Sequence, residues 1–440
     1  MSWATRDKNV LWHPFTSMKE WIEGEPLVIA RAEGRYLIDV EGRRYFDAVS
    51  SLWVTVHGHS HPAIVRAIER QLGELDHSTL LGLAHPSSIE LAERLVALAP
   101  PGLTRVFYSD SGSTAVEIAL KQAFQYWAHG GRPAKHRFLH LVDAYHGDTL
   151  GAVGVGGIPL FHRIFGPLVV AGIGLASPAA VRGESEAQAL SRGLAALEDA
   201  LVQHGHELAA FVIEPLVQGA AGMLVHPRGY LKAAADLCTR YDVLLIADEV
   251  ATGFGRTGTM FACEQEGVRP DLMAVAKGLT GGVLPLAATL CTDRVFSAFL
   301  HPRPDLRTFF HGHTYTGNPL ACAAALANLD LFESDHVLAH VVQLSEWMAT
   351  ALREVSASAA VARVRQRGVM AGIDLEDRGA PFPPERFVGS LVAEAARAHG
   401  VILRPLGDTL VWMPPLSTTR DEIQHLARAT SAAIHDVCAA

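Results

Sequence analysis

Two charged residues, Asp248 and Lys277, have the types and the spacing that could carry amine chemistry. Each follows a short apolar run of strand length, Val243–Ala247 before the aspartate and Leu272–Ala276 before the lysine. Such runs predict buried strands of a parallel sheet, and the carboxyl ends of parallel strands open onto a ligand crevice. We therefore expect the carboxylate and the amine to lie on the rim of the same crevice.

This pair suits the chemistry of pyridoxal 5'-phosphate. A lysine amine forms a Schiff base with the aldehyde of that cofactor, and an aspartate pairs with its protonated pyridine nitrogen, so that the ring withdraws electrons. Burial lowers the pKa of a lysine, which makes a neutral amine available near pH 7. The alternative interpretation is that both residues only mark where the chain reaches water, as most charged residues do.

A candidate phosphate-binding turn lies at Ser111, Gly112 and Ser113. These residues follow a predicted strand at Arg105–Tyr108 and precede a helix that begins near Ser113, indicated by apolar residues at helical spacing. A strand-to-helix turn offers free backbone N–H groups and the positive end of the helix dipole to a phosphate. Taken alone the turn is also an ordinary helix cap, but beside a lysine and an aspartate it predicts the seat of the cofactor phosphate.

Two more predicted strands end in polar residues. The run at 137–142 leads into DAYHGDT, where Tyr145 can lay its ring on a planar cofactor and His146 is expected only to orient its neighbours. The run Ala210–Ile213 ends in Glu214, whose carboxylate can organise the network around the aspartate or the phenolic oxygen of the cofactor.

The stretches around the aspartate and the lysine, DEVATGFGRTG and AKGLTGG, resemble the core signature of the class III aminotransferases. The resemblance covers nearly the whole chain through LWHPFTSM, SSLWVTVHGH, HSTLLG, SDSGS, YHGDT, IEPLVQGAAG, HTYTGNPLACAAA and RPLGD. It implies a fold type I transferase that depends on pyridoxal 5'-phosphate, with Lys277 as the Schiff-base lysine, Asp248 as the pyridine partner and Tyr145 stacked on the ring. It also implies that Thr314 reaches the phosphate of the neighbouring subunit, so the active site lies at the interface of a homodimer.

Within the family, the motifs are most similar to the branch that acts in biotin synthesis. This resemblance implies transamination of 8-amino-7-oxononanoate to 7,8-diaminononanoate, with Arg404 on the substrate carboxylate and Trp53 against its alkyl chain. The resemblance also assigns substrate binding to Phe15, Tyr145, Gly312 and Lys277. Ornithine-type members of the family read QGE where this chain reads Gln218-Gly219-Ala220, which argues against ornithine or acetylornithine as substrate.

The amino donor stays open between S-adenosylmethionine and lysine. Phe15 stands where the form that uses adenosylmethionine typically has Tyr, and Leu52 stands where that form has a second Trp beside Trp53. The loss of a hydroxyl and of an indole changes the surface that accommodates a sulfonium group. The segments HSTLLG, HTYTGN and RPLGD are also similar to a variant branch that takes its amine from lysine.

Two other functions remain open. A general ω-amino acid:pyruvate aminotransferase of the same fold would carry the same motifs around Lys277. More remote is a regulatory protein that binds pyridoxal phosphate without turnover, against which the intact Lys277, Asp248 and Tyr145 argue.

The elements that must position these residues indicate an α/β protein. Strands and helices alternate over residues 61–330, which predicts a large domain with a mostly parallel sheet of the seven-stranded type. Residues 1–60 and 331–440 are expected to form the two parts of a small α+β domain. Residues 151–206 predict surface loops and one helix, with no chemistry.

The composition of the chain argues against several other classes of protein. The chain has 440 residues, of which 49% are hydrophobic and 19% charged, enough for a large core. A net charge of −9 argues against nucleic acid or an anionic membrane surface as partner. Five scattered cysteines indicate neither disulfides nor a metal site. Because no signal peptide or apolar run of membrane length is found, we expect a soluble cytoplasmic protein.

Overall fold

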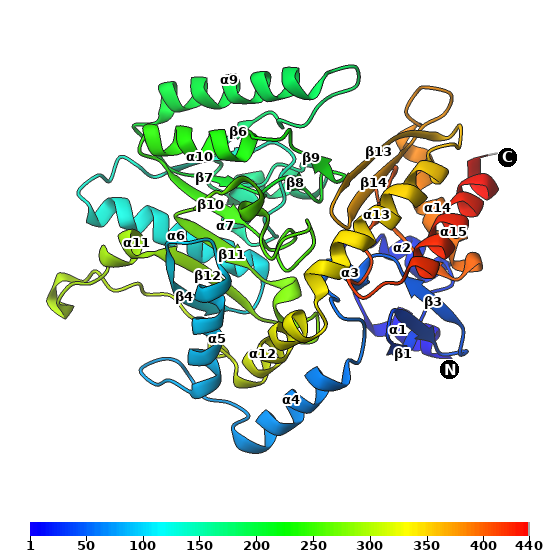
Figure 1. Ribbon diagram of the computed structural model, residues 1–440, viewed down its shortest axis with the longest axis horizontal. Coiled ribbons are helices and arrows are strands. Elements are labelled where there is room, and N and C mark those ends of the chain that lie inside the picture. Colours follow the sequence, from blue (N-terminus) through cyan, green and yellow to red (C-terminus); the bar gives the residue numbers. More distant parts are fainter. Residues whose placement is uncertain (439–440) are drawn as a thin grey trace.

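The structure is a computed structural model that describes residues 1–438, and its centre is one seven-stranded sheet (Figure 1). The strands run in the order β4 (Leu103–Ser109), β12 (Ala287–Thr292), β11 (Leu272–Val275), β10 (Leu244–Asp248), β7 (Leu208–Ile213), β5 (Arg137–Leu141) and β6 (Ile173–Leu175). Strand β12 is antiparallel to both of its neighbours, and the other pairs are parallel. The predicted α/β fold with a mostly parallel sheet is confirmed.

Strand β10 shows why the apolar runs are continuous. Its alternate side chains face opposite sides of the sheet, so Leu244 and Ile246 join the core under helix α6 (Gly112–His129), whereas Leu245 and Ala247 join the larger core on the other side. Both faces of this strand are therefore buried away from water. Strands β10 and β11 are parallel neighbours, which brings their carboxyl ends to the same edge.

Helices cover both faces of the large sheet (Figure 1). Helix α6 packs on one face, and α5 and α10 pack on the other. The further helices of this part are α4 (Pro62–Glu74), α5 (Pro86–Leu98), α9 (Glu186–His204), α10 (Tyr230–Arg240), α11 (Asp293–Ser297) and α12 (Pro319–Ser334).

Two four-stranded sheets form the smaller part of the molecule. They are β1 (Ile29–Glu33), β2 (Tyr36–Asp39), β3 (Arg44–Asp47) and β15 (Val401–Ile402) in one, and β13 (Val361–Arg367), β14 (Met370–Leu375), β17 (Thr409–Trp412) and β16 (Arg404–Leu406) in the other. Helices α13 (Val337–Val355), α14 (Val388–Ala395) and α15 (Arg420–Cys438) pack together beside them. Because β15 pairs with β3, Val401 and Ile402 share one sheet with strands from the first fifty residues of the chain. The division into three sequence segments stays a prediction.

The prediction for residues 151–206 was wrong in part. Besides α9, this stretch holds most of the short helix α7 (Leu150–Gly154), all of α8 (Pro159–His162), and the edge strand β6. Elements of three to five residues are too short to produce a hydrophobic period, so the sequence pattern could not indicate them. The other short elements are α1 (Trp3–Val10), α2 (Met18–Glu23), α3 (Ser50–Trp53), β8 (Val217–Gln218) and β9 (Leu224–Val225).

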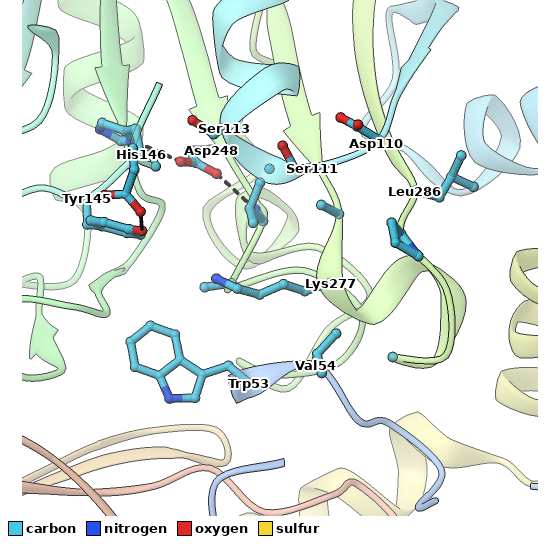
Figure 2. A pocket seen from close by; sticks show the side chains of 18 of the residues that line it. Trp53, Val54, Asp110, Ser111, Ser113, Tyr145, His146, Asp248, Lys277 and Leu286 are labelled. Atoms are coloured by element: carbon cyan, nitrogen blue, oxygen red, sulfur yellow. Dashed lines mark hydrogen bonds and ion pairs between the residues drawn. The ribbon is translucent and has the colours of Figure 1, made fainter. Parts of the chain in front are cut away.

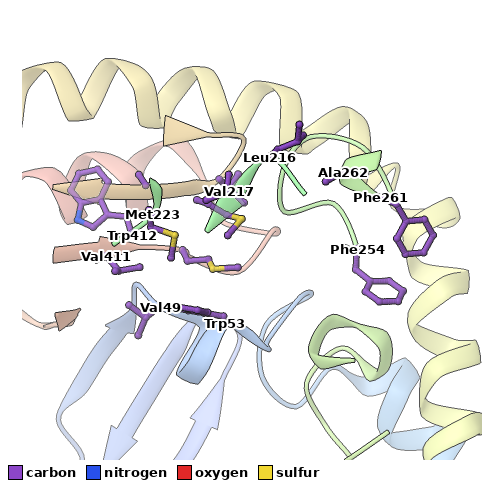
Figure 3. Packing of buried hydrophobic residues seen from close by; sticks show 14 of the residues in the cluster. Val49, Trp53, Leu216, Val217, Met223, Phe254, Phe261, Ala262, Val411 and Trp412 are labelled. Carbon is purple, nitrogen blue, oxygen red and sulfur yellow. The ribbon is translucent and has the colours of Figure 1, made fainter. Parts of the chain in front are cut away.

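A single buried cluster joins the smaller part to the loops beside the large sheet. Figure 3 shows Val49 and Trp53 facing the β8–β9 hairpin, with Met223 and Trp412 packed in the same layer. This cluster fixes Trp53, which lies at the boundary of the candidate site. Over residues 1–438, none of the helices has the length and apolar character that crossing a membrane requires.

Candidate active site

A cavity of about 810 Å³ lies at the carboxyl edge of the large sheet. Asp248 ends β10, and Lys277 follows β11 by two residues, so the parallel pairing of these strands brings both into the cavity wall. Figure 2 shows the side chain of Lys277 running between Trp53 and Asp248. Helix α6 contributes its first residues to the same cavity.

Asp248 is buried and held from two sides. Its Oδ2 lies 2.6 Å from Nδ1 of His146, and its Oδ1 accepts a hydrogen bond from the backbone N–H of Val250 at 3.0 Å. Burial lowers the pKa of His146, but the hydrogen bond and the charge of Asp248 outweigh it, so the net shift is upward. His146 therefore supports a negative charge on Asp248, which is the charge that a protonated pyridine nitrogen requires.

Lys277 is partly buried and has a free amine. No hydrogen bond to its Nζ occurs within the described residues, and Nζ lies 5.2 Å from the centroid of the Trp53 ring. Burial lowers the pKa of Lys277, and the charges of Asp248 and Glu214 oppose that shift without cancelling it. The backbone of Lys277 has a φ of +44°, a conformation that non-glycine residues adopt at functional sites under constraint. The residue is thus poised as a nucleophile or a base.

The first turn of helix α6 forms an anion cradle. Ser111 caps the helix and exchanges hydrogen bonds with Thr114, while the backbone N–H groups of Gly112 and Ser113 have no acceptor among the described residues. The Oγ of Ser113 lies 2.7 Å from the Oγ1 of Thr149. Gly147 has a φ of +115°, and a Cβ added there would stand 2.3 Å from Ser113. The cradle is therefore open because residue 147 is glycine.

Tyr145 and Glu214 form the side of the cavity next to Asp248. The hydroxyl of Tyr145 donates to Oδ2 of Asp148 at 2.6 Å, and burial together with this contact raises the pKa of Tyr145. Glu214 accepts hydrogen bonds from the backbone N–H groups of Tyr145 and Gly219, at 3.2 and 2.8 Å. Burial raises the pKa of Glu214 to about 7. This carboxyl group is therefore able to hold or release a proton near neutral pH.

Four predicted site residues do not line this cavity. Phe15 is exposed and contacts Phe161 edge-to-face, with 5.3 Å between the ring centroids. Gly312 and Thr314 are exposed in the loop before α12. Arg404 is partly buried close enough to Tyr145 for their charges to interact, and burial lowers its pKa. The nine predicted residues that do line the cavity are Trp53, Ser111, Gly112, Ser113, Tyr145, His146, Glu214, Asp248 and Lys277.

Several lining residues were not predicted. They are Val54, Asp110, Gly147, Asp148, Thr149, Ala220, Val250, Ala251, Ala276 and the loop 282–286. The motif YHGDT contains three of them, so their positions had a signal although no role was assigned. Gly282 ends the motif AKGLTGG, but residues 283–286 belong to no motif, so nothing in the sequence placed them at the cavity.

The residues present fit pyridoxal phosphate. The cavity offers a free amine at Lys277, a buried carboxylate at Asp248, an aromatic ring at Tyr145, and unpaired N–H groups at Gly112 and Ser113. Each of these groups matches one chemical feature of that cofactor: aldehyde, pyridine nitrogen, ring face and phosphate.

Comparison with known proteins supports the same interpretation. The family model described as "Aminotransferase class-III" matches residues 18–434. Adenosylmethionine-8-amino-7-oxononanoate aminotransferase from Nitratidesulfovibrio vulgaris is 54% identical over 432 residues, which cover 96% of this chain and 80% of that protein. The protein of the same name from Geobacter sulfurreducens is 51% identical over 438 residues, covering 98% of this chain and 97% of the relative.

Two solved structures are also similar to this chain. The adenosylmethionine-8-amino-7-oxononanoate aminotransferase from Methanocaldococcus jannaschii superposes with a TM-score of 0.94 at 42% identity, covering 99% of this chain and 98% of that one. The ω-transaminase from Pseudomonas jessenii, solved in complex with PMP, gives a TM-score of 0.95 at 33% identity, covering 100% of this chain and 99% of that one.

Proposed function

The chain belongs to the class III aminotransferases, which depend on pyridoxal phosphate, and from this premise we propose that in the cytoplasm it transfers an amino group to 8-amino-7-oxononanoate. The product is 7,8-diaminononanoate, a step of biotin synthesis. The observation that carries the choice of substrate is the 54% identity to a relative named for this acceptor, over 96% of the chain. The reaction class has independent support in the free amine and the buried carboxylate that share one cavity.

We assign the proton transfer to Lys277. Bound pyridoxal phosphate supplies an aldehyde that takes up the amino group and a ring that withdraws electrons. The Nζ of Lys277, whose pKa burial lowers, is placed to act as the base that removes the proton from the donor carbon and as the acid that gives it back. Asp248, oriented by His146, would hold the ring nitrogen of the bound cofactor through its carboxylate, which favours the protonated nitrogen.

The remaining assignments concern binding. Ser111, Gly112 and Ser113 hold the phosphate, and Glu214 holds the network next to the ring. For the substrate, we propose Trp53 against the alkyl chain and Arg404 on the carboxylate, because a guanidinium binds a carboxylate through two parallel hydrogen bonds. Phe15 and Gly312 complete the substrate site.

The donor is S-adenosylmethionine or lysine. The names of the relatives favour adenosylmethionine, whereas Phe15 and Leu52 favour lysine because they lack the hydroxyl and the indole that a sulfonium donor would contact. Purified holoenzyme is mixed with 8-amino-7-oxononanoate and one donor at a time, and 7,8-diaminononanoate is measured by mass spectrometry. Product with either donor, and none with Lys277→Ala, is the expected result.

A second candidate is a general ω-amino acid:pyruvate aminotransferase. The observation that favours it is the TM-score of 0.95 to an ω-transaminase. Rapid transfer from alanine or from an ω-amine, together with no product from 8-amino-7-oxononanoate under either donor, would replace our assignment by this one.

We further propose a homodimer whose partner completes each site. Gly312 and Thr314 are exposed, and Leu306, Phe310 and Tyr315 in the same loop present large apolar surfaces that a second copy would cover. Thr314→Asp should repel the cofactor phosphate in the site of the partner subunit. Lys277→Ala disables the site of the subunit that carries the substitution. Mixed dimers of the two variants then contain one intact site, so co-expression should restore activity that neither variant has alone. A monomer by sedimentation, or no restoration, would overturn this proposal.

A further inference from the structure

His162 is a polar residue buried in a segment that is otherwise exposed. It ends α8, where its side chain is 8% exposed, while Leu160 in the same turn is 85% exposed. Its ring packs close to Gly156, where an added Cβ would lie 3.6 Å from Cε1, an ordinary contact distance. The imidazole is buried next to Tyr145, although the short helix that carries it is largely exposed.

The ring of His162 contacts both members of the Tyr145–Asp148 pair. Its Nε2 lies 3.3 Å from Oδ1 of Asp148, and its plane is 14° from that of Tyr145, with 6.0 Å between the ring centroids. The other carboxylate oxygen, Oδ2, accepts the hydroxyl of Tyr145 at 2.6 Å. Because a carboxylate only accepts, Nε2 of His162 carries the proton in this contact.

Packing alone does not explain a histidine at this position. The Nδ1 of His162 is buried and has no partner among the described residues, and an unpaired buried polar atom is costly. An apolar ring would fill the same space without that cost. Among the described residues, Asp148 is the one side chain that hydrogen-bonds to His162, and it lies at the cavity wall with half of its side chain exposed.

We propose that His162 is a positioning residue for the Tyr145–Asp148 pair, holding the carboxylate by its Nε2–H and supporting the phenol ring by its own ring. Asp148 is then fixed in one rotamer, and the Tyr145 hydroxyl with it. The inference deepens the proposed function, since it rests on this cavity being the substrate site. Phe161, the preceding residue, packs on Phe15, so the same short helix supports two parts of the substrate wall.

Three variants of the holoenzyme test the assignment. His162→Phe keeps the ring and removes the donor, His162→Gln keeps an N–H donor, and Leu160→Ala is the matched control on the exposed side of the turn. Each is followed through the half-reaction with 7,8-diaminononanoate by cofactor absorption, and the affinity of the apoenzyme for pyridoxal phosphate is measured separately. We expect His162→Phe to raise the half-saturating amine concentration about tenfold, with the limiting rate within about twofold.

Cofactor affinity should stay at the wild-type value in His162→Phe and Leu160→Ala, because both keep an aromatic ring beside Tyr145, the residue assigned to the ring face of the cofactor. His162→Gln should recover most of the loss. The inference is overturned if His162→Phe behaves as wild type, if His162→Gln fails equally, or if cofactor affinity falls in parallel. If the wild type itself does not react with this amine, the proposed substrate is wrong, and the variants are compared on the amine that does react, with the same expectation.

Discussion

At the scale of single residues, the site depends on two opposed influences on Lys277. Burial favours its neutral form, and the negative charges of Asp248 and Glu214 favour its protonated form. The net effect is a lowered pKa, which a general base near pH 7 needs. Asp248 is the second residue on which the assignment rests, because its negative charge favours a protonated pyridine nitrogen on the cofactor.

The variant Asp248→Asn tests whether the negative charge of this side chain, and not its size, supports the reaction. The side chain keeps its size and still contacts His146, but the charge is gone, so the rate of the half-reaction should fall about a hundredfold or more. Stopped-flow absorption of the cofactor measures this rate. The exposed Asp236→Asn on α10 is the matched control, and a rate in Asp248→Asn equal to that of the control would contradict the assignment.

A second buried histidine, His226, should make stability depend on pH. Both of its ring nitrogens lack a partner within residues 1–438, and burial lowers its pKa to about 3. Below about pH 6.5 the unfolded chain binds a proton at this residue and the folded chain does not, so stability falls as the pH drops from 6.5 towards 3.

His226→Leu removes this titration. Between pH 7.5 and 5.5 the variant should lose about 1.4 kcal/mol less free energy of unfolding than the wild type, as measured by urea unfolding at both pH values. Exposed His206→Leu should keep the wild-type difference. If the free energy of unfolding depends on pH identically in the wild type and in His226→Leu, His226 is hydrated or protonated in the folded protein, which contradicts this prediction.

At the scale of elements, the cradle at the start of α6 depends on Gly147. A Cβ there would displace Ser113, so Gly147→Ala should weaken pyridoxal phosphate binding about tenfold or more, measured by titration of the apoenzyme. Gly102→Ala is the control, since Gly102 has a similar φ of +106° and no atom within 4 Å of the added Cβ. Equal cofactor affinity in the two variants would mean that only backbone strain, and not the cradle, was changed.

The elements also show which features a sequence can predict. The apolar runs before Asp248 and Lys277 are local and continuous, so their burial and their shared edge follow from the rules of parallel sheets. The helix predicted to begin near Ser113 rests on an equally local signal, and α6 begins at Gly112. By contrast, the position of His162 depends on a one-turn helix, and that of residues 283–286 depends on a loop whose Gly282 approaches the backbone of Val54. Neither leaves a period or a motif in the sequence.

At the scale of the whole molecule, one buried guanidinium ties the smaller part to the site. Arg365 on β13 pairs with Asp374 and donates to the backbone oxygens of Gly222 and Met223 in the β8–β9 hairpin. That hairpin continues to Gly219, which packs on Trp53 and donates to Glu214. The two parts of the molecule are therefore joined next to the cavity.

Arg365→Met should lower the free energy of unfolding by about 3 kcal/mol or more, because it leaves Asp374 and two carbonyl groups without their partner. Chemical unfolding followed by tryptophan fluorescence measures the loss. The exposed Arg378→Met on the adjacent loop should change little. A loss in Arg365→Met as small as that in Arg378→Met would show that this junction contributes nothing to stability.

The most direct test of the central claim is borohydride reduction of the holoenzyme followed by peptide mass mapping, with and without prior addition of 7,8-diaminononanoate. Reduction fixes the cofactor on the lysine that holds it. Our account predicts the label on Lys277 alone, and loss of that label after the amine has been added, because the amino group then resides on the released cofactor. A label on another lysine, or a label on Lys277 that the amine does not remove, would contradict the claim that this cavity carries out transamination with this substrate.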